Sequence, residues 1–349
     1  SIIPSSLLTT NALEVVEDPS VEIVVEVMGG IEPSRSLILK AISLGKSVVT
    51  ANKAVIARHG QEIAQAANTS GVYVLIEAAV GGGIPIIEPI KQSLGGNKIK
   101  KVSGIINGTT NYILSHMTKN GSAFEAVLKE AQELGYAESN PSADVEGIDA
   151  ADKISILSGL AFGGPIDRSK IPTKGINQLK SRDIDYASRL GYTIKLLGIA
   201  ESLAKSFNSE NSKLPLALRV EPTLIPNKHP LAGVNGVNNA IFIEGDPIGE
   251  VMFYGPGAGA GPTASAVVAD ILNIAGVKGL NTSSNFLDPL LSYASWRKCE
   301  LVDEKAIIQK NYVRLTTEDS PGVIGQIGNI FGKNNVSIQS IVQFDSTSN

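Results

Sequence analysis

The sequence contains few of the residues that build disulfide frameworks, zinc sites or membrane spans. Its 349 residues include one cysteine, Cys299, which excludes a disulfide framework and fits a reducing compartment. The three histidines, His59, His116 and His229, are too far apart in sequence to show a zinc-binding spacing. No uninterrupted apolar run approaches the ~20 residues of a membrane helix, and no signal peptide is visible. We therefore expect a cytoplasmic protein with no membrane partner.

The chain also has no large excess of charge. Thirty basic against 34 acidic side chains give a net charge of −4, which argues against nucleic acid or an anionic membrane as partner. With 43% hydrophobic and 18% charged residues, the composition suits a globular protein. A chain of this length is expected to form two or three domains.

A third absence concerns phosphate binding. Dinucleotide-binding folds normally open with a strand, a GxGxxG turn and a helix, and nothing of that kind precedes Val21. The glycines at 255–261 follow no convincing first strand, so we do not interpret them as that fingerprint.

Strand and helix patterns nevertheless alternate in the first third of the chain. The predicted strands cover 21–27, 46–50 and 72–76, with helices at 33–44 and 53–67. This spacing predicts right-handed βαβ units and a parallel sheet. Ligands of such sheets bind at the carboxyl ends of the strands. Here those ends lead into Met28, Gly29 and Gly30, and into Thr50, Asn52 and Lys53.

The rest of the chain has a mixed pattern that begins after the glycines at 81–83. Expected strands are 98–106, 193–200 and 214–221, and expected helices are 111–117, 123–134, 183–190 and 263–275. The final segment, 311–349, reads as strand, helix, strand.

The most informative segment is an acidic run that ends in a lysine. Its members are Glu138, Asp144, Glu146, Asp149, Asp152 and Lys153. Asp149 and Lys153 are four residues apart and share one face of a predicted helix, and apolar residues at 156, 157 and 160 lie on or beside that face. A lysine there must be paired or partly desolvated, a setting in which lysines act as acids or bases. A structural ion pair at a helix start is the alternative interpretation.

This run resembles the signature of homoserine dehydrogenase. The matching positions are Ala131, Gly135, Pro141, Asp144, Gly147, Asp149 and Lys153. Segments 24–30, 48–54, 77–85 and 103–117 resemble the same family in the same order, so the likeness covers about residues 20–280. The turn 319–322, Asp-Ser-Pro-Gly, precedes a predicted helix and resembles an ACT regulatory domain.

The resemblance implies an α/β chain in several parts. Residues 1–82, completed by about 256–285, would form a partial Rossmann-type NAD(P)-binding domain. Residues 83–255 would form an α+β substrate and dimerisation domain, followed by a linker at 286–310 and a partial ACT-like, ferredoxin-like domain at 311–349. Because the family's opening glycine loop and about half of an ACT domain are missing, we expect a fragment that reduces neither NAD nor NADP until the upstream segment is restored.

The implied reaction interconverts L-homoserine and L-aspartate 4-semialdehyde with NAD or NADP, in threonine, methionine and isoleucine biosynthesis. The cofactor takes the hydride and a side chain takes the proton. By resemblance, Lys153 transfers the proton, Lys53 polarises the oxygen near the nicotinamide, and Asp149 orients Lys153. Without the resemblance, Lys53 would be interpreted as helix surface and Glu138 as a solvated loop acid.

The resemblance also implies residues that contact the ligands. Substrate would be bound by Glu138, Asp144, Tyr136 and Thr109. Cofactor would be contacted by Met28, Gly29, Gly30, Thr50, Asn52, Lys53, Gly257 and Gly259. A monovalent cation, usually sodium, would be bound mostly by backbone carbonyls at Glu77, Val80, Gly82 and Ile84, since hard cations prefer oxygen ligands. The alternative for 77–84 is a glycine-rich turn before a helix.

Two other functions compete with this one. A different NAD(P)-dependent oxidoreductase on a similar fold would lack the signature from Glu138 to Lys153. An amino-acid-binding regulatory protein with an inert catalytic half would not need Lys53, Asp149 and Lys153. We expect a small-molecule enzyme that forms at least a homodimer, with apolar strands at 196–199 and 214–220 available for the interface.

Overall fold

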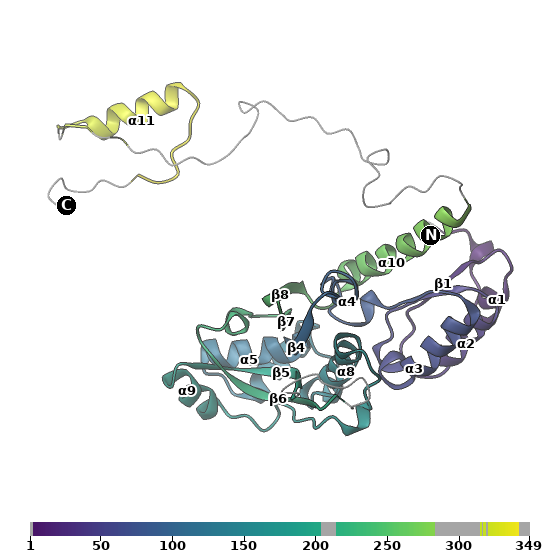
Figure 1. Ribbon diagram of the computed structural model, residues 1–349. Coiled ribbons are helices and arrows are strands. Elements are labelled where there is room, and N and C mark those ends of the chain that lie inside the picture. Colours follow the sequence, from purple (N-terminus) through teal and green to yellow (C-terminus); the bar gives the residue numbers. More distant parts are fainter. Residues whose placement is uncertain (1–2, 204–213, 283–314, 316, 319, 342–349) are drawn as a thin grey trace. The chain divides into compact units, whose positions relative to one another are not determined.

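The structure is a computed structural model that describes residues 3–203, 214–282, 315, 317–318 and 320–341. The chain divides into two compact units, Ser1–Pro289 and Leu290–Asn349. The first unit contains two sheets, and the second contributes one described helix (Figure 1).

The first sheet is parallel and three-stranded, in the order β1-β2-β3. Its strands are β1 (Ile23–Glu26), β2 (Ser47–Thr50) and β3 (Val74–Leu75). The helices beside it are α1 (Ala12–Glu17), α2 (Ser34–Ser43) and α3 (Lys53–Ser70). Asn52 caps the start of α3, and Gly71 ends it in the left-handed conformation, φ 65°. The α/β alternation predicted for this region is confirmed.

The second sheet is antiparallel and five-stranded, in the order β6-β5-β4-β7-β8. Its strands are β4 (Lys98–Ile105), β5 (Tyr192–Ser202), β6 (Leu216–Pro226), β7 (Asn238–Asp246) and β8 (Gly249–Pro256). We did not predict β7 and β8 from the sequence. The available signal was the turn between Asp246 and Gly249, followed by the short apolar run 251–254. Residues of β7 are buried on both faces, so that strand shows no alternation.

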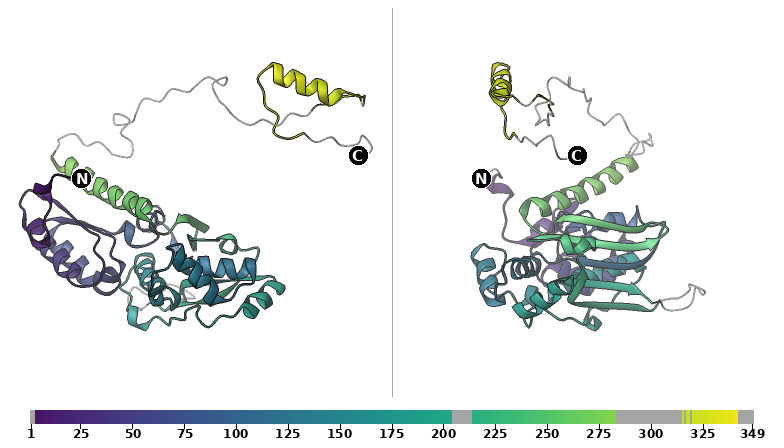
Figure 2. Two further views of the ribbon diagram at one scale, coloured as in Figure 1. Left: turned by 180° about the vertical axis from the view of Figure 1, so that it is seen from behind. Right: turned by 90° about the vertical axis from the view of Figure 1, so that its left-hand side faces the viewer.

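Helices cover one face of this sheet (Figure 2). They include α5 (Gly108–Asn120), which contacts β5 and β7, and α8 (Ile148–Phe162), which contacts β4 and β5. The short α4 (Ile87–Lys91) packs against α8. The remaining helical segments are α6 (Phe124–Glu133), α7 (Ser142–Val145), α9 (Ser181–Arg189), η1 (Ser5–Leu7), η2 (Glu77–Ala79), η3 (Arg168–Lys170) and η4 (Pro230–Gly233). On the other face, Leu197, Ile199 and Phe242 pack with η4. Since these strand residues are buried within the chain, segment 196–199 does not offer the free interface that we expected.

The long helix α10 (Ala260–Thr282) follows β8 of the second sheet and packs against β2 of the first sheet and against η2. Among the described residues it alone is long and apolar enough to cross a bilayer, by length and composition only. Its buried Asp270 accepts a hydrogen bond from the Glu77 backbone N–H at 2.9 Å, which anchors the helix to η2.

The second unit contains α11 (Val323–Lys333), which begins directly after the predicted turn at 319–322. The described residues beside α11 form no strand. The strand predicted near residue 311 and the end of the chain beyond 341 lie outside the described residues.

Candidate active site

Three chain segments bring the predicted catalytic residues together. Lys53 begins α3 directly after β2, and Asn107 follows β4 and caps α5 by accepting from the Thr110 N–H at 2.9 Å. Gly147, with φ 83°, precedes α8 and places Asp149 in its first turn. An L side chain at Gly147 would be strained in this left-handed conformation, so glycine suits the sharp entry to α8.

Asp149 is the centre of the site. Its Oδ1 lies 2.9 Å from Lys53 Nζ, and its Oδ2 lies 2.8 Å from Lys153 Nζ. Its side chain is only 7% exposed. Burial by itself would raise the pKa of Asp149, but the charges of Lys153 and Lys53 outweigh it and hold the pKa well below its usual range. The site therefore contains a buried, ionised carboxylate between two lysines.

The two lysines have different surroundings. Lys153 is almost buried, with a side chain 11% exposed, and also donates to the Ile106 carbonyl at 2.8 Å. The Lys53 side chain is 41% exposed. Burial acts to lower the pKa of Lys53, but the nearby carboxylates, Asp149 foremost, raise it overall. Lys53 is thus a cation that solvent reaches, whereas Lys153 is held against the protein.

Asn107 is a site residue that we missed in the sequence. Its Nδ2 donates to Asp144 Oδ1 at 2.7 Å and to Asp149 Oδ2 at 3.0 Å. One amide therefore connects the predicted substrate carboxylate to the predicted catalytic carboxylate. The turn beginning at Asn107 was visible in the sequence, but an N-cap explains such an asparagine equally well, and here it performs both roles.

The other predicted substrate residues lie around the loop after α6. Thr109 Oγ1 donates to the Tyr136 carbonyl at 2.7 Å, which fixes the loop to α5. Tyr136 is 45% exposed, and its ring is tilted against Tyr112 with centroids 5.0 Å apart. Glu138 is exposed, and its backbone carbonyl accepts from Gln132 Nε2 at 3.0 Å.

The first group of predicted cofactor residues lies at the carboxyl ends of β1 and β2. The buried Glu26 fixes part of this group by hydrogen bonds. Glu26 accepts from Thr50 Oγ1 at 2.6 Å and from the Met28 N–H at 2.9 Å. Asn52 Nδ2 donates to the Gly30 carbonyl at 2.7 Å. Sequence analysis missed Glu26, because a single acid at a strand end has no distinctive pattern.

This strand-end loop suits the close approach of a nucleotide. Gly29 and Gly30 have φ values of 80° and 75°, and both glycines and Met28 are exposed. An exposed glycine turn at the carboxyl end of parallel strands lets a ligand approach the backbone. The residues present therefore fit a dinucleotide at this edge.

The second group of glycines has a packing role of its own. A Cβ at Gly82 would lie 2.6 Å from the Gly257 carbonyl, so the two loops touch backbone to backbone. A Cβ at Gly257 would lie 1.9 Å from Asn239 Nδ2, which is buried without a hydrogen-bond partner in the described part of the chain. Gly259 has φ 122°, another conformation that favours glycine. Steric demand thus accounts for Gly257 without any ligand.

Glu77 belongs to the predicted cation loop, and its carboxylate is occupied by hydrogen bonds within the protein. The two oxygens accept from the N–H groups of Ile86, Ile87 and Glu88 at the start of α4. Any cation at Glu77, Val80, Gly82 and Ile84 would therefore have to bind backbone carbonyls. No cluster of three or more His, Cys, Asp or Glu side chains suited to a metal occurs among the described residues.

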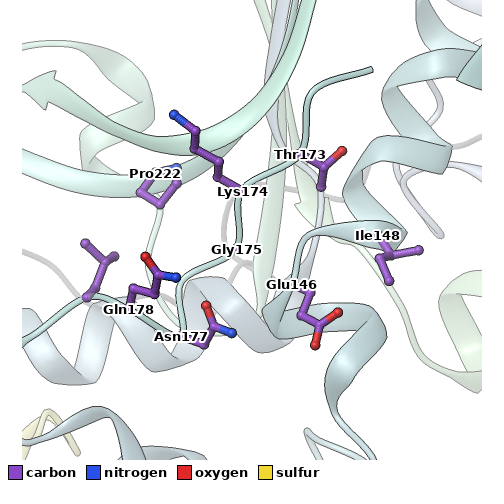
Figure 3. Close-up of a pocket in the computed structure, with 9 residues that line it drawn as sticks. Glu146, Ile148, Thr173, Lys174, Gly175, Asn177, Gln178 and Pro222 are labelled. Carbon is purple, nitrogen blue, oxygen red and sulfur yellow. The ribbon is translucent and has the colours of Figure 1, made fainter. Parts of the chain in front are cut away.

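A surface hollow of about 550 Å³ lies beside the start of α8 but contains none of the predicted site residues (Figure 3). It is lined by Glu146, Ile148, Thr173, Lys174, Gly175, Asn177, Gln178, Leu179 and Pro222. Glu146 and Lys174 extend in different directions in Figure 3 and do not converge on one point. The hollow and the cluster around Asp149 are therefore separate features of the surface.

Comparison with known families assigns three parts of the chain. The description "Homoserine dehydrogenase" matches residues 85–272, and "Homoserine dehydrogenase, NAD binding domain" matches residues 2–77. The description "ACT domain" matches residues 311–349.

Individual relatives agree with these matches. A homoserine dehydrogenase of Synechocystis is 55% identical over 345 residues, which are 99% of this chain and 78% of the relative. A homoserine dehydrogenase of Bacillus subtilis is 40% identical, over 98% of this chain and 76% of the relative.

Solved structures show the same likeness. A homoserine dehydrogenase from Thiobacillus denitrificans superimposes with a TM-score of 0.74 at 43% identity, over 96% of this chain and 75% of that chain. A hyperthermophilic archaeal homoserine dehydrogenase in complex with NADPH superimposes with a TM-score of 0.65 at 29% identity, over 77% of this chain and 76% of that chain.

Proposed function

The chain belongs to the homoserine dehydrogenase family, and we propose that Asp149, with Lys53 and Lys153 on either side, forms its reaction centre. The function of the chain is the NAD(P)-dependent interconversion of L-homoserine and L-aspartate 4-semialdehyde. The observation that carries the proposed centre is a single buried carboxylate that contacts two lysines from different helices.

The two lysines have different roles at the reacting oxygen. The bound nicotinamide supplies or accepts the hydride. Lys153 gives a proton to the oxygen in the reductive direction and takes it back in the oxidative direction. Lys53, the more exposed cation, polarises that oxygen. Asp149 balances both charges and, with the Ile106 carbonyl, fixes the orientation of the Lys153 amine.

Substrate recognition uses the carboxylates near this centre. The ammonium group of homoserine requires an anionic partner, and Glu138 and Asp144 supply it. The Asn107 amide supports this assignment because it draws Asp144 toward Asp149. Tyr136 and Thr109 border the same loop and contribute hydrogen bonds.

The geometry of the strand ends supports the proposed cofactor residues. Met28, Gly29, Gly30, Thr50 and Asn52 line the carboxyl edge of the parallel sheet, and Lys53 extends from that edge to Asp149. Gly257 and Gly259 would contact the cofactor from the start of α10. A sodium ion would be held by the backbone carbonyls of Glu77, Val80, Gly82 and Ile84. We also propose a cytoplasmic location, in keeping with the single cysteine.

The proposed centre is tested by following nicotinamide reduction with homoserine in the full-length protein. Asp149→Asn keeps the volume of the side chain but removes the charge that balances two lysines, so we expect activity to fall by roughly 10² or more. Asp185→Asn is the matched control, because Asp185 forms an i,i+4 ion pair with Arg189 on α9. Full activity of Asp149→Asn would contradict the assignment.

We also propose that the enzyme forms at least a homodimer. The described edges of the second sheet are β6 and β8, and both expose apolar side chains, including Leu224, Met252 and Tyr254. Light scattering of the full-length gene product at micromolar concentration should give at least twice the mass of one chain. A monomer mass would contradict the proposal.

A further inference from the structure

The reaction centre is divided between two packed helices. Lys53 belongs to the first turn of α3, whereas Asp149 and Lys153 belong to α8. The distance between Lys53 and Asp149 therefore depends on how firmly α3 is held against α8. Because a displacement of ~1 Å can cost a catalytic group about 10² in rate, this packing matters for the reaction.

A second buried carboxylate, Asp152, lies at the contact between these helices. Its Oδ2 is 2.9 Å from Arg58 Nη1 on α3, and its Oδ1 is 2.7 Å from Arg168 Nε on η3. The Asp152 residue is only 4% exposed. A buried carboxylate with both oxygens bound to arginines makes strong, charge-assisted hydrogen bonds, and losing one partner leaves a buried charge uncompensated.

Both arginines also bind main-chain carbonyls directly beside the reaction centre. Arg58 Nη1 donates to the carbonyl of Ala54, the residue after Lys53, at 3.1 Å. Arg168 Nη2 donates to the carbonyl of Ile148, the residue before Asp149, at 3.2 Å. Asp152 therefore joins the backbone at Lys53 to the backbone at Asp149 through two arginines.

We propose that Asp152 is a positioning residue, which holds Lys53 against Asp149 by clamping α3 to α8 through Arg58, while Arg168 holds Asp152 against the start of α8. This inference rests on the reaction centre proposed above. Among the described residues, Asp152 forms its ion pairs with Arg58 and Arg168 and not with either lysine, although its charge helps to raise the pKa of Lys53. Because Arg58→Gln keeps the Asp152 charge and breaks the clamp, it tests the placement of Lys53 apart from this charge. The competing interpretation is an ion pair that stabilises the fold and has no effect on the reaction.

The first experiment compares kcat and KM for homoserine in the full-length gene product. Asp152→Asn removes the charge with little change in volume, and we expect kcat to fall about tenfold with KM changed less than about twofold. Arg58→Gln breaks the same clamp from α3, at a side chain that is 34% exposed, and leaves Arg168 bound to the other oxygen of Asp152, so it should give a similar loss. Unchanged kcat in both variants would overturn the proposal.

The matched control is Glu62→Gln. Glu62 lies one turn beyond Arg58 on α3 and binds Arg35 of α2 at 2.5 Å, so the variant breaks an ion pair of the same helix that does not reach α8. We expect its kcat to equal that of the unmodified enzyme. A tenfold loss in Glu62→Gln would show that any charge change on α3 lowers kcat, which would also overturn the proposal.

A double-mutant cycle separates positioning from stability. If Asp152 acts by placing Lys53, then adding Asp152→Asn to Lys53→Ala should lower kcat by less than about twofold, since the placed group is already absent. If the tenfold loss recurs in the Lys53→Ala background, Asp152 does not act through Lys53. Thermal unfolding of every variant checks that the folded fraction is the same.

The same cycle distinguishes failure of this inference from failure of the reaction centre. Full activity of Lys53→Ala would remove Lys53 from the centre and would overturn both proposals. Loss of activity in Lys53→Ala, together with full activity in Asp152→Asn and Arg58→Gln, would overturn only the clamp.

Discussion

Lys53 Nζ and Asp149 Oδ1 are 2.9 Å apart, although the two residues belong to different helices and different family domains. Lys53 leaves the carboxyl edge of the parallel sheet, where nucleotides bind. Asp149 lies in the first turn of α8, which packs on the antiparallel sheet. This ion pair therefore joins the NAD-binding part of the chain to the part that carries the family signature.

Removing the Lys153 amine should abolish most of the activity. Lys153→Ala eliminates the proposed acid–base group, and we expect kcat to fall by roughly 10² or more. Lys129→Ala removes an exposed lysine of an i,i+4 pair on α6 and should leave kcat unchanged. Circular dichroism should report the same helix content in both variants. A fully active Lys153→Ala enzyme would assign proton transfer to another group.

Glu138→Gln should weaken the binding of homoserine and leave the binding of the cofactor unchanged. The change removes the charge at nearly constant volume, so homoserine KM should rise about tenfold or more while the KM for the nicotinamide cofactor stays within about twofold. Glu133→Gln, at an exposed position five residues earlier, is the control. An unchanged homoserine KM would identify Glu138 as a solvated loop acid.

Asp270 should make stability depend on pH. Burial raises the pKa of Asp270 to about 6 from its ordinary value of 3.8, so the folded state binds more protons than the unfolded state between these values. Stability from this group is then lost as pH rises from about 4 to about 6. Asp270→Asn removes the titration and can still accept from the Glu77 N–H.

The measurement is the free energy of unfolding of both proteins at several pH values. We compare the free energy of unfolding of Asp270→Asn with that of the unmodified protein. The difference in favour of the variant should increase by up to about 3 kcal/mol between pH 4 and 6 and stay constant above pH 6. A difference that stays constant across this range would show that Asp270 has an ordinary pKa in the folded protein.

Gly257→Ala should destabilise the fold. The added methyl group would lie 1.9 Å from the buried Asn239 side chain, so one of the two must move, at an expected cost of about 1–3 kcal/mol. Gly276→Ala on α10 is the control, because nothing lies within 4 Å of its added Cβ, and it should stabilise by about 0.5–1 kcal/mol. Denaturant unfolding measures both, and a neutral Gly257→Ala would show that Asn239 moves aside freely.

Local patterns in the sequence were sufficient for the parallel layer and for the core of the signature. The strands and helices between residues 21 and 76 follow from short-range periodicity, and their bounds differ from the structure by a few residues. Asp149 and Lys153 are four apart on one helix, so their 2.8 Å contact also follows from local geometry. Periodicity did not reveal β7, because a strand buried on both faces carries no alternation.

The tertiary structure alone decided which distant groups meet. The amide that bridges Asp144 and Asp149, the Glu26 carboxylate under the glycine turn, and the Asp152 clamp all depend on residues from separate segments. Sequence spacing carries information only about neighbours along one helix or strand. Tertiary packing decides which charges meet across helices. The contact of Asp149 with Lys153 on its own helix was therefore predictable from local spacing, whereas its contacts with Lys53 and Asn107 were not.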